Sequence, residues 1–178
     1  MARYVVLLRG INLARSRRVA MGDLRALLGE LGYEDVATHL QSGNVVLSTT
    51  VKAAELPGRL EAELADGLGM KIPVVVRSRA QLAKVVAADP LGDVADDPKR
   101  YLVTFFPDKP DPAAVRALLA EDFGPERVAA VGREIYTWHA NGIQKSKLAR
   151  AVGDKRFGTG GTARNWSTVT KLLDLASR

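Results

Sequence analysis

Along the first 78 positions, short apolar runs typical of buried strands alternate with segments whose apolar residues have helical spacing. A continuous run rich in Val and Leu at Arg3–Arg9 predicts a buried strand. Leucines then recur at intervals of three and four residues, which predicts helices over Met21–Leu31 and over residues 53–68. A glycine follows each of these helices, as is common at helix ends.

Two further strands, Val36–Gln41 and Val45–Thr50, flank the short sequence Ser-Gly-Asn and predict a hairpin. Gly43-Asn44 suits a tight turn because both residue types tolerate positive φ angles. Lys71–Arg77, with three consecutive valines, is expected to form a fourth strand. The resulting order, β-α-β-β-α-β, is that of the split-βαβ or ferredoxin-like fold.

The second half repeats this order in outline. After a helix at about 79–88 and an acidic loop, the pattern predicts strands Tyr101–Phe106, Arg127–Val131 and Glu134–His139, and helices from Pro112 to about Leu119, over 144–152 and over 166–176. "YVVLLRG" parallels "YLVTFFP", and "VATHLQSGNVVLS" parallels "VAAVGREIYTW", each pair with a helix between. We therefore expect a duplicated β-α-β-β-α unit.

These patterns predict an α+β protein of two fused ferredoxin-like (split βαβ) subdomains with antiparallel sheets and packed helices. The expected boundaries are residues 1–78 for the first subdomain, 79–99 for a connecting helix and acidic loop, and 100–178 for a second, related βαββα subdomain with a C-terminal helix. A chain of 178 residues can bury a sufficient core without disulfides, and this one contains no cysteine.

Basic residues gather in two segments that are far apart in the sequence. Residues 1–19 contain five arginines and no acidic residue, and residues 144–164 contain six basic residues against Asp154 alone. The whole chain has a net charge of only +6, because acidic residues outnumber basic ones elsewhere. Such segregation indicates an anionic partner, and an ordinary solvated surface explains it about equally well.

The sequence gives little support for catalysis or metal binding. His39 and His139 are too few for an ordinary zinc or iron site without cysteines, so neither a metal nor a cofactor is expected. Ser42 lies in Gln-Ser-Gly-Asn rather than in the Gly-x-Ser-x-Gly of hydrolases and is better explained as a turn residue. The chain has no glycine motif for nucleotides, and the aspartates of residues 89–97 are more typical of a solvated linker than of a magnesium site.

Two aromatic residues on one predicted strand could belong either to the core or to a nucleic-acid interface. Tyr136 and Trp138 lie two positions apart on a predicted strand and so share a face. They could stack on nucleic-acid bases, but burial in the core is the favoured interpretation. No apolar run is long enough for a signal peptide or a membrane helix, so we expect a cytoplasmic protein without a membrane partner.

The glycine-rich sequence "GTGGTARN" (158–165) precedes the last predicted helix. Its glycines do not have the spacing of a phosphate-binding loop, so a flexible lead into the helix is the simpler interpretation. Asn165 is expected to be the N-cap of that helix, with Thr162 as the alternative start. Arg164 has no role in such a cap and stays a candidate for binding an anion.

Several of these motifs together resemble the uncharacterised bacterial family catalogued as domain of unknown function 1697. The resemblance covers nearly the whole chain and is carried by "LLRGIN", "MGDLRALLGELGY", "QSGNVV", "SKL" and "GTARNWSTVTKL". It implies two ferredoxin-like subdomains and no established activity, substrate or catalytic residue. The chain departs from the family pattern after Asn12, where relatives commonly have a Gly-Gly pair, and at His39, where a tyrosine is usual.

Three functional hypotheses remain. The first is a cytoplasmic binding protein for a phosphate-bearing ligand, either a metabolite or nucleic acid, that uses both basic segments. The second is a small-molecule enzyme with a polar site between the subdomains, and the third is a non-catalytic interaction module. The candidate ligand-binding residues are Arg9, Asn12, Arg15, Arg17, Arg18, Gln41, Ser42, Asn44, Lys147, Arg164 and Asn165.

Overall fold

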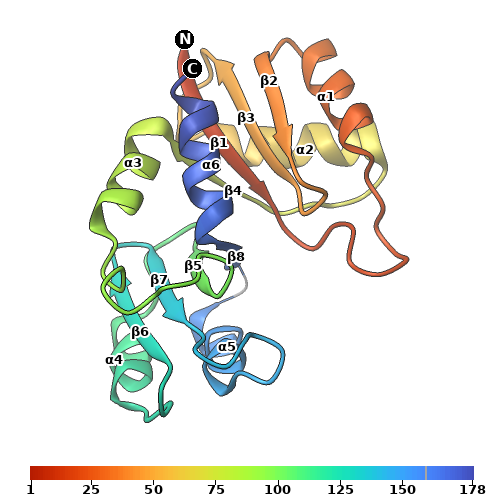
Figure 1. The fold of residues 1–178 in the computed structure, drawn as a ribbon. Coiled ribbons are helices and arrows are strands. Elements are labelled where there is room, and N and C mark those ends of the chain that lie inside the picture. The colour runs from red at the N-terminus through yellow and green to blue at the C-terminus, as the bar shows by residue number, and fades with distance from the viewer. Residues whose placement is uncertain (159) are drawn as a thin grey trace. The chain divides into compact units, whose positions relative to one another are not determined.

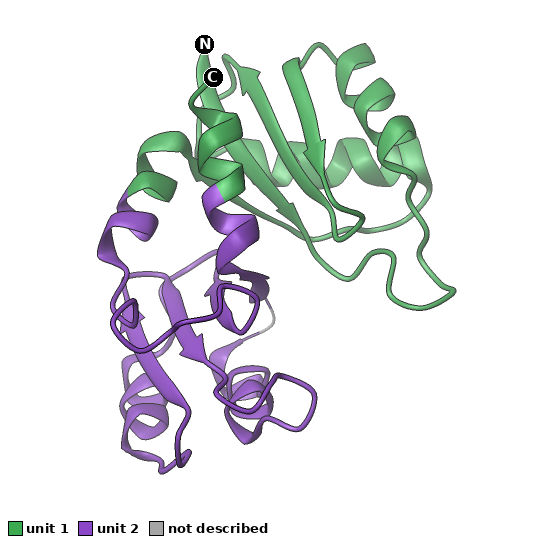
Figure 2. Cartoon of the chain, viewed as in Figure 1, with its two compact units in different colours: residues 1–83, 171–178 green, residues 84–170 purple. Residues whose placement is uncertain are grey.

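The computed structural model of the chain describes residues 1–158 and 160–178. They divide into two compact units, unit 1 with residues 1–83 and 171–178 and unit 2 with residues 84–170 (Figure 2). Two helices, α3 (Arg79–Ala88) and α6 (Trp166–Ala176), each contribute residues to both units. Each unit contains one four-stranded antiparallel sheet with packed helices, so the predicted α+β class is confirmed.

Unit 1 has the predicted order of elements. They are β1 (Ala2–Leu8), α1 (Met21–Glu30), β2 (Glu34–His39), β3 (Asn44–Thr49), α2 (Leu56–Leu68) and β4 (Val74–Ser78). The strands lie in the order β2-β3-β1-β4, with every neighbouring pair antiparallel. This is the arrangement of the split-βαβ motif, in which β3 pairs between the two strands that flank the first helix in the sequence.

One face of the unit 1 sheet is covered by α1 and α2 (Figure 1). Leu24 and Leu60 of these helices pack with alternate strand residues such as Val6 and Val45, and all four are at most 1% exposed. The end of α6 lies on the opposite face, where Arg3 Nη2 of β1 donates to the backbone oxygen of Leu175 at 3.2 Å. The last residues of the chain are therefore part of the unit that contains the first ones.

Unit 2 repeats the same topology. Its elements are β5 (Tyr101–Phe105), α4 (Pro112–Ala120), β6 (Arg127–Val131), β7 (Glu134–Trp138), α5 (Lys147–Val152), the 3₁₀ helix η1 (Lys155–Phe157) and β8 (Thr162–Asn165). The strand order is β6-β7-β5-β8, which matches unit 1 strand for strand. The predicted duplication is thus present as shared topology.

Strand β8 corrects the expectation of a flexible lead into the last helix. Its residues pair with β5 from Leu102↔Asn165 to Phe105↔Thr162 and complete the second sheet. The sequence Thr-Ala-Arg-Asn has neither the apolar run nor the alternation that predicts a strand, so the pattern does not reveal it. Asn165 is the predicted cap, since its Oδ1 accepts from the Thr168 amide at 3.0 Å.

The two aromatic residues of β7 are core residues, as favoured by the sequence. Tyr136 is fully buried and Trp138 is 6% exposed. The Tyr136 hydroxyl donates to the Val85 backbone oxygen at 2.9 Å, and the Tyr101 ring stacks on Trp166 at 4.7 Å between centroids. Neither β7 ring is available to stack on a nucleic-acid base.

The turn between β2 and β3 depends on glycine at position 43. Gly43 has φ +87°, and a Cβ built there would lie 2.8 Å from both Leu8 Cβ and Ile11 Cδ1. Gly69, which ends α2, also has a positive φ (+67°), but a Cβ built there would meet no neighbouring atom. Substitution at Gly69 would therefore cause backbone strain alone, whereas substitution at Gly43 would cause both strain and a steric clash.

We expect Gly43→Ala to lower the free energy of unfolding by about 2–5 kcal/mol, from left-handed strain plus overpacking. Gly69→Ala, the matched control, should cost only ~1–2 kcal/mol because strain alone applies. Urea unfolding of both variants measures the difference. Equal losses would show that the Gly43 turn is not tightly packed.

Candidate functional site

One end of unit 1 collects most of the predicted ligand-binding residues. It consists of the loop between β1 and α1, residues 9–20, called here the arginine loop, and the turn between β2 and β3, residues 40–43, called the hairpin turn. Pairing of Leu7 with Asn44 and the bond from the Leu8 amide to the Gly43 oxygen (2.8 Å) bring the two together. Seven predicted residues lie here, and Asn44 follows the hairpin turn as the first residue of β3: Arg9, Asn12, Arg15, Arg17, Arg18, Gln41 and Ser42.

Asn12 joins the arginine loop to the hairpin turn. Its Nδ2 donates to the backbone oxygens of Val19 at 2.9 Å and Gln41 at 2.6 Å. Its Oδ1 accepts from the Val19 amide at 2.8 Å. These bonds use the whole amide group across the loop, so Asn12 shapes the site and has little capacity left for a ligand.

Arg17 anchors the middle of the arginine loop to the body of unit 1. Its Nε donates to the Gly10 oxygen at 2.8 Å and its Nη2 to the Lys71 oxygen at 2.5 Å. Two of the five N–H groups of the guanidinium are thereby committed to backbone carbonyls. The residue predicted to bind an anion thus has a structural contribution as well.

The hairpin turn is stabilised by the side chain of Asn44. This residue is fully buried, and its Nδ2 donates to the His39 oxygen at 2.7 Å and to Ser42 Oγ at 3.0 Å. Ser42 and Gln41 are exposed at the tip. The geometry supports the interpretation of Ser42 as a turn residue.

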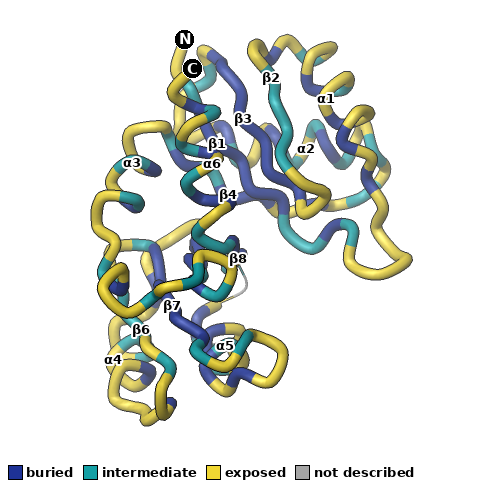
Figure 3. Tube along the Cα trace, in the orientation of Figure 1, coloured by how far each residue is buried: buried dark blue, intermediate teal, exposed yellow. Residues whose placement is uncertain are grey.

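Arg15, Arg17 and Arg18 are all exposed, but only Arg17 is held by hydrogen bonds. Within the described residues, neither guanidinium makes a hydrogen bond or an ion pair. Most of the loop around them is exposed (Figure 3). The first acidic residue of the chain is Asp23, beyond the loop, so no loop carboxylate neutralises them.

The backbone of this region is strained at several points. Asn12, Ala14 and Arg17 in the arginine loop and Leu40 in the hairpin turn have φ between 52° and 61°. They are four of the six non-glycine residues with positive φ among residues 1–158 and 160–178. Such strain costs free energy and clusters at functional sites.

The other predicted residues belong to unit 2. Lys147 begins α5 and is exposed, with its Nζ 5.8 Å from the centre of the Phe123 ring. Arg164 is only 8% exposed, and its Nη1 donates to Thr162 Oγ1 at 2.8 Å and to the Ala163 oxygen at 2.9 Å. Burial lowers the pKa of Arg164 to about 10, which leaves it charged at neutral pH. Binding of one ligand by both basic segments stays a prediction.

A buried polar cluster in unit 2 was not predicted by the sequence. His139 Nδ1 lies 2.9 Å from Glu126 Oε2 and 2.8 Å from Ser146 Oγ, while its Nε2 lies 2.8 Å from Thr137 Oγ1. Ser146 also caps α5 by accepting from the Ala149 amide at 2.9 Å. The cluster therefore ties the start of α5 to β7. Only the Ser146 N-cap position has a sequence signal.

A hydroxyl, an imidazole and a carboxylate in a row resemble a catalytic relay. Thr137 and His139, however, are 2% and 0% exposed, so a substrate has no access to the hydroxyl. Burial lowers the pKa of His139, with the hydrogen bond to Glu126 opposing the shift. Burial also works against ionisation of Glu126, but bonds from Ser146, His139 and an amide outweigh it and hold its pKa below the ordinary value. The role of the cluster is therefore structural, because it holds the start of α5 against β7.

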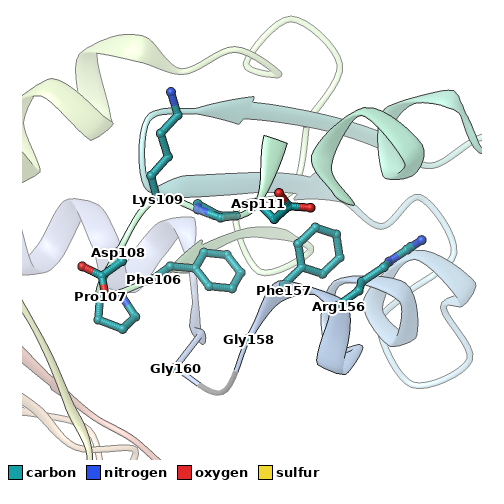
Figure 4. Close-up of a pocket in the computed structure, with 10 residues that line it drawn as sticks. Phe106, Pro107, Asp108, Lys109, Asp111, Arg156, Phe157, Gly158 and Gly160 are labelled. Carbon is teal, nitrogen blue, oxygen red and sulfur yellow. The ribbon is translucent and has the colours of Figure 1, made fainter. Parts of the chain in front are cut away.

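The glycine-rich segment lies beside a cavity of about 340 Å³ in unit 2 (Figure 4). A Cβ at Gly160 would lie 2.5 Å from Pro107 Cγ, and one at Gly161 would lie 2.6 Å from Phe106 Cε1. These two glycines therefore permit close packing against the end of β5. The predicted flexible lead also includes Thr159, which lies outside the described residues.

The lining of this cavity is electrically balanced. The rings of Phe106 and Phe157 lie together at its floor (Figure 4), 6.3 Å apart between centroids. Two acidic and two basic residues accompany them: Asp108, Asp111, Lys109 and Arg156. Asp111 caps α4 and Arg156 pairs with Glu121 at 2.9 Å, so half of these charges are already engaged.

Comparison with known proteins agrees with this architecture. A model of the family described as protein of unknown function (DUF1697) matches residues 1–136, and the chain belongs to this family. A solved structure, that of the conserved bacterial protein SP0830 from Streptococcus pneumoniae, superposes with a TM-score of 0.81 at 23% identity, covering 98% of each chain. This likeness shows the shared fold. No curated protein matches the chain.

The part of the chain that the structure describes contains neither a cluster of metal ligands nor a membrane-spanning helix. There, no three or more acidic or histidine side chains come together as ligands for a metal ion. No described helix has the length and apolar character needed to cross a membrane.

The His139 cluster makes stability depend on pH. The unfolded chain takes up a proton on this imidazole near pH 6.5, whereas the folded chain does so only at lower pH. Acid therefore favours unfolding, and the free energy of unfolding should fall below about pH 6.5 by at most ~1.4 kcal/mol per pH unit. Glu126, whose pKa is also lowered, adds a further loss below about pH 4.3.

Urea unfolding between pH 7 and 5 tests this. His139→Gln should flatten the dependence, whereas His39→Gln, which retains His139, should keep the wild-type slope. A wild-type slope in His139→Gln would show that another group is responsible.

Proposed function

We propose that this chain is a cytoplasmic binding protein for a phosphate-bearing ligand, and that Arg15 and Arg18 of the arginine loop contact the phosphate. The observation that carries the proposal is the contrast within one acid-free loop. All three arginines are exposed, but Arg17 is bonded to backbone carbonyls, whereas Arg15 and Arg18 make no hydrogen bond or ion pair with a described residue. Guanidinium groups make bidentate bonds to phosphate oxygens.

The fixed backbone supports the same proposal. Asn12 bonds the loop to Gln41 of the hairpin turn and Arg17 bonds it to Lys71, while bonds from Arg17 to Gly10 and from Val19 to Asn12 close the loop on itself. A loop that is already ordered loses less conformational entropy when a ligand binds. The strained residues then have an explanation, because they set the direction in which the two free arginines project.

The ligand can be a phosphorylated metabolite or a nucleic acid, and both present the same phosphate chemistry. The buried rings of β7 do not supply a base-stacking platform, so binding through phosphate groups is expected to dominate. Among residues 1–158 and 160–178, no specific contact within either unit favours the enzyme or the interaction module considered above.

We expect wild-type protein to be stabilised by some member of a panel of nucleotides, phosphorylated metabolites and oligonucleotides in a thermal-shift assay at two salt concentrations. For an oligonucleotide, affinity should fall steeply with salt. Arg15→Ala with Arg18→Ala should weaken it about tenfold or more and reduce the salt slope by about 2, one per lost phosphate contact.

The matched control is Arg79→Ala with Lys84→Ala, which removes two exposed charges from α3 and should change affinity less than about threefold. An equal loss in both double variants would mean that net charge alone binds the probe. If no panel member stabilises the protein at either salt concentration, the proposal is wrong.

A further inference from the structure

A second cavity in unit 2 combines an apolar wall with a charged rim. Its volume is about 270 Å³, and it shares Lys109 and Pro110 with the cavity of Figure 4. The other lining residues come from α4, β6, the turn after β6 and β7: Pro112, Val115, Arg116, Ala130, Gly132, Glu134 and Ile135. All of them belong to one unit and to the described part of the chain.

The apolar wall is held in place before any ligand arrives. Ile135 is fully buried, and Val115 and Ala130 pack against the unit 2 core. Pro110 and Pro112 restrict the neighbouring backbone, and Asp111 between them caps α4 by accepting from the Ala114 amide at 3.0 Å. A preformed apolar wall is typical of small-molecule sites.

The charges at the rim are unequal. Lys109 and Arg116 are exposed, and neither makes an ion pair with a described residue. Figure 4 shows the Lys109 side chain pointing away from the Phe106 and Phe157 rings of the other cavity. Glu134 supplies the one carboxylate of the lining and is 8% exposed.

We propose that this cavity binds a small organic acid with an apolar body. The apolar part packs on Val115, Ala130 and Ile135, and the acidic group lies between Lys109 and Arg116. The volume of about 270 Å³ lies just below the ~300–1,000 Å³ typical of ligand pockets, which favours a ligand of modest size.

This site is separate from the arginine loop and independent of the function proposed above. The neighbouring cavity is the weaker candidate, because its two basic residues are matched by two acidic ones. In the present cavity the cations outnumber the carboxylate two to one.

Two fluorescent probes test the proposal. The first is 8-anilinonaphthalene-1-sulfonate, an apolar body with an acidic group, and the second is N-phenyl-1-naphthylamine, which has a similar body without charge. We expect wild-type protein to bind one sulfonate probe per chain. Lys109→Ala with Arg116→Ala should weaken that binding about fivefold or more, while the uncharged probe should change less than about twofold.

Three controls locate the binding. Arg150→Ala with Lys155→Ala removes two exposed cations of unit 2 that do not line the cavity and should leave both affinities unchanged. Arg15→Ala with Arg18→Ala should also leave them unchanged, which separates this site from the phosphate site. Ala130→Leu fills the cavity and should weaken both probes, with a thermal melt to verify folding.

The proposal is wrong if the Lys109/Arg116 variant binds the sulfonate probe as wild type does, or no more weakly than the Arg150/Lys155 variant. It is also wrong if the uncharged probe loses affinity to the same extent, because the rim charges would then have no part in recognition. Unchanged binding by folded Ala130→Leu would place the probe outside the cavity.

Discussion

The main constraint on this fold is that both faces of the central strands of each sheet have to be covered. In β1, five consecutive residues from Tyr4 to Leu8 are at most 6% exposed, although neighbouring side chains point to opposite faces. A strand that is apolar on both faces must be covered on both. The helices α1 and α2 cover one face of the sheet, which leaves the second face in need of other residues.

Unit 2 meets the same requirement with aromatic residues. On the face opposite α4 and α5, Tyr101, Tyr136 and Trp166 pack together, and the Tyr136 hydroxyl is satisfied by the Val85 oxygen. The β7 rings are consequently core residues, and the adjacent polar residues Thr137 and His139 are buried as well. His139 can be buried only because Thr137, Glu126 and Ser146 satisfy its two nitrogens.

Local patterns predicted most of the fold. The leucine spacing of α1 and α2 and the glycine turn at Gly43 each encode one element through nearby residues, and all are present. Strand β8 was missed because its four residues are held by pairing with β5, which lies about sixty positions earlier in the sequence. The His139 cluster was missed for the same reason, because its members become neighbours only after folding.

The candidate site was predictable in composition and less so in function. The sequence drew attention to the arginines of residues 9–20, and the structure places them in one loop beside the hairpin turn. Counting charges could not distinguish Arg17, bonded to two backbone oxygens, from Arg15 and Arg18. Nor could it show that Arg164 is buried. Hydrogen-bond partners supplied by distant backbone decide which arginine is available to a ligand.

The composition of unit 1 also bears on the order of events during synthesis. Residues 171–178 belong to the same unit as the first strand, and Arg3 is bonded to the oxygen of Leu175. A ribosome exposes the chain from its N-terminus, so the first unit to emerge is still incomplete when all of unit 2 has been made. Unit 2, whose residues are contiguous in the chain, can finish folding first. Arg3 can pair with Asp35 and Ser48 early, but its bond to the Leu175 oxygen forms only after the last helix has been made.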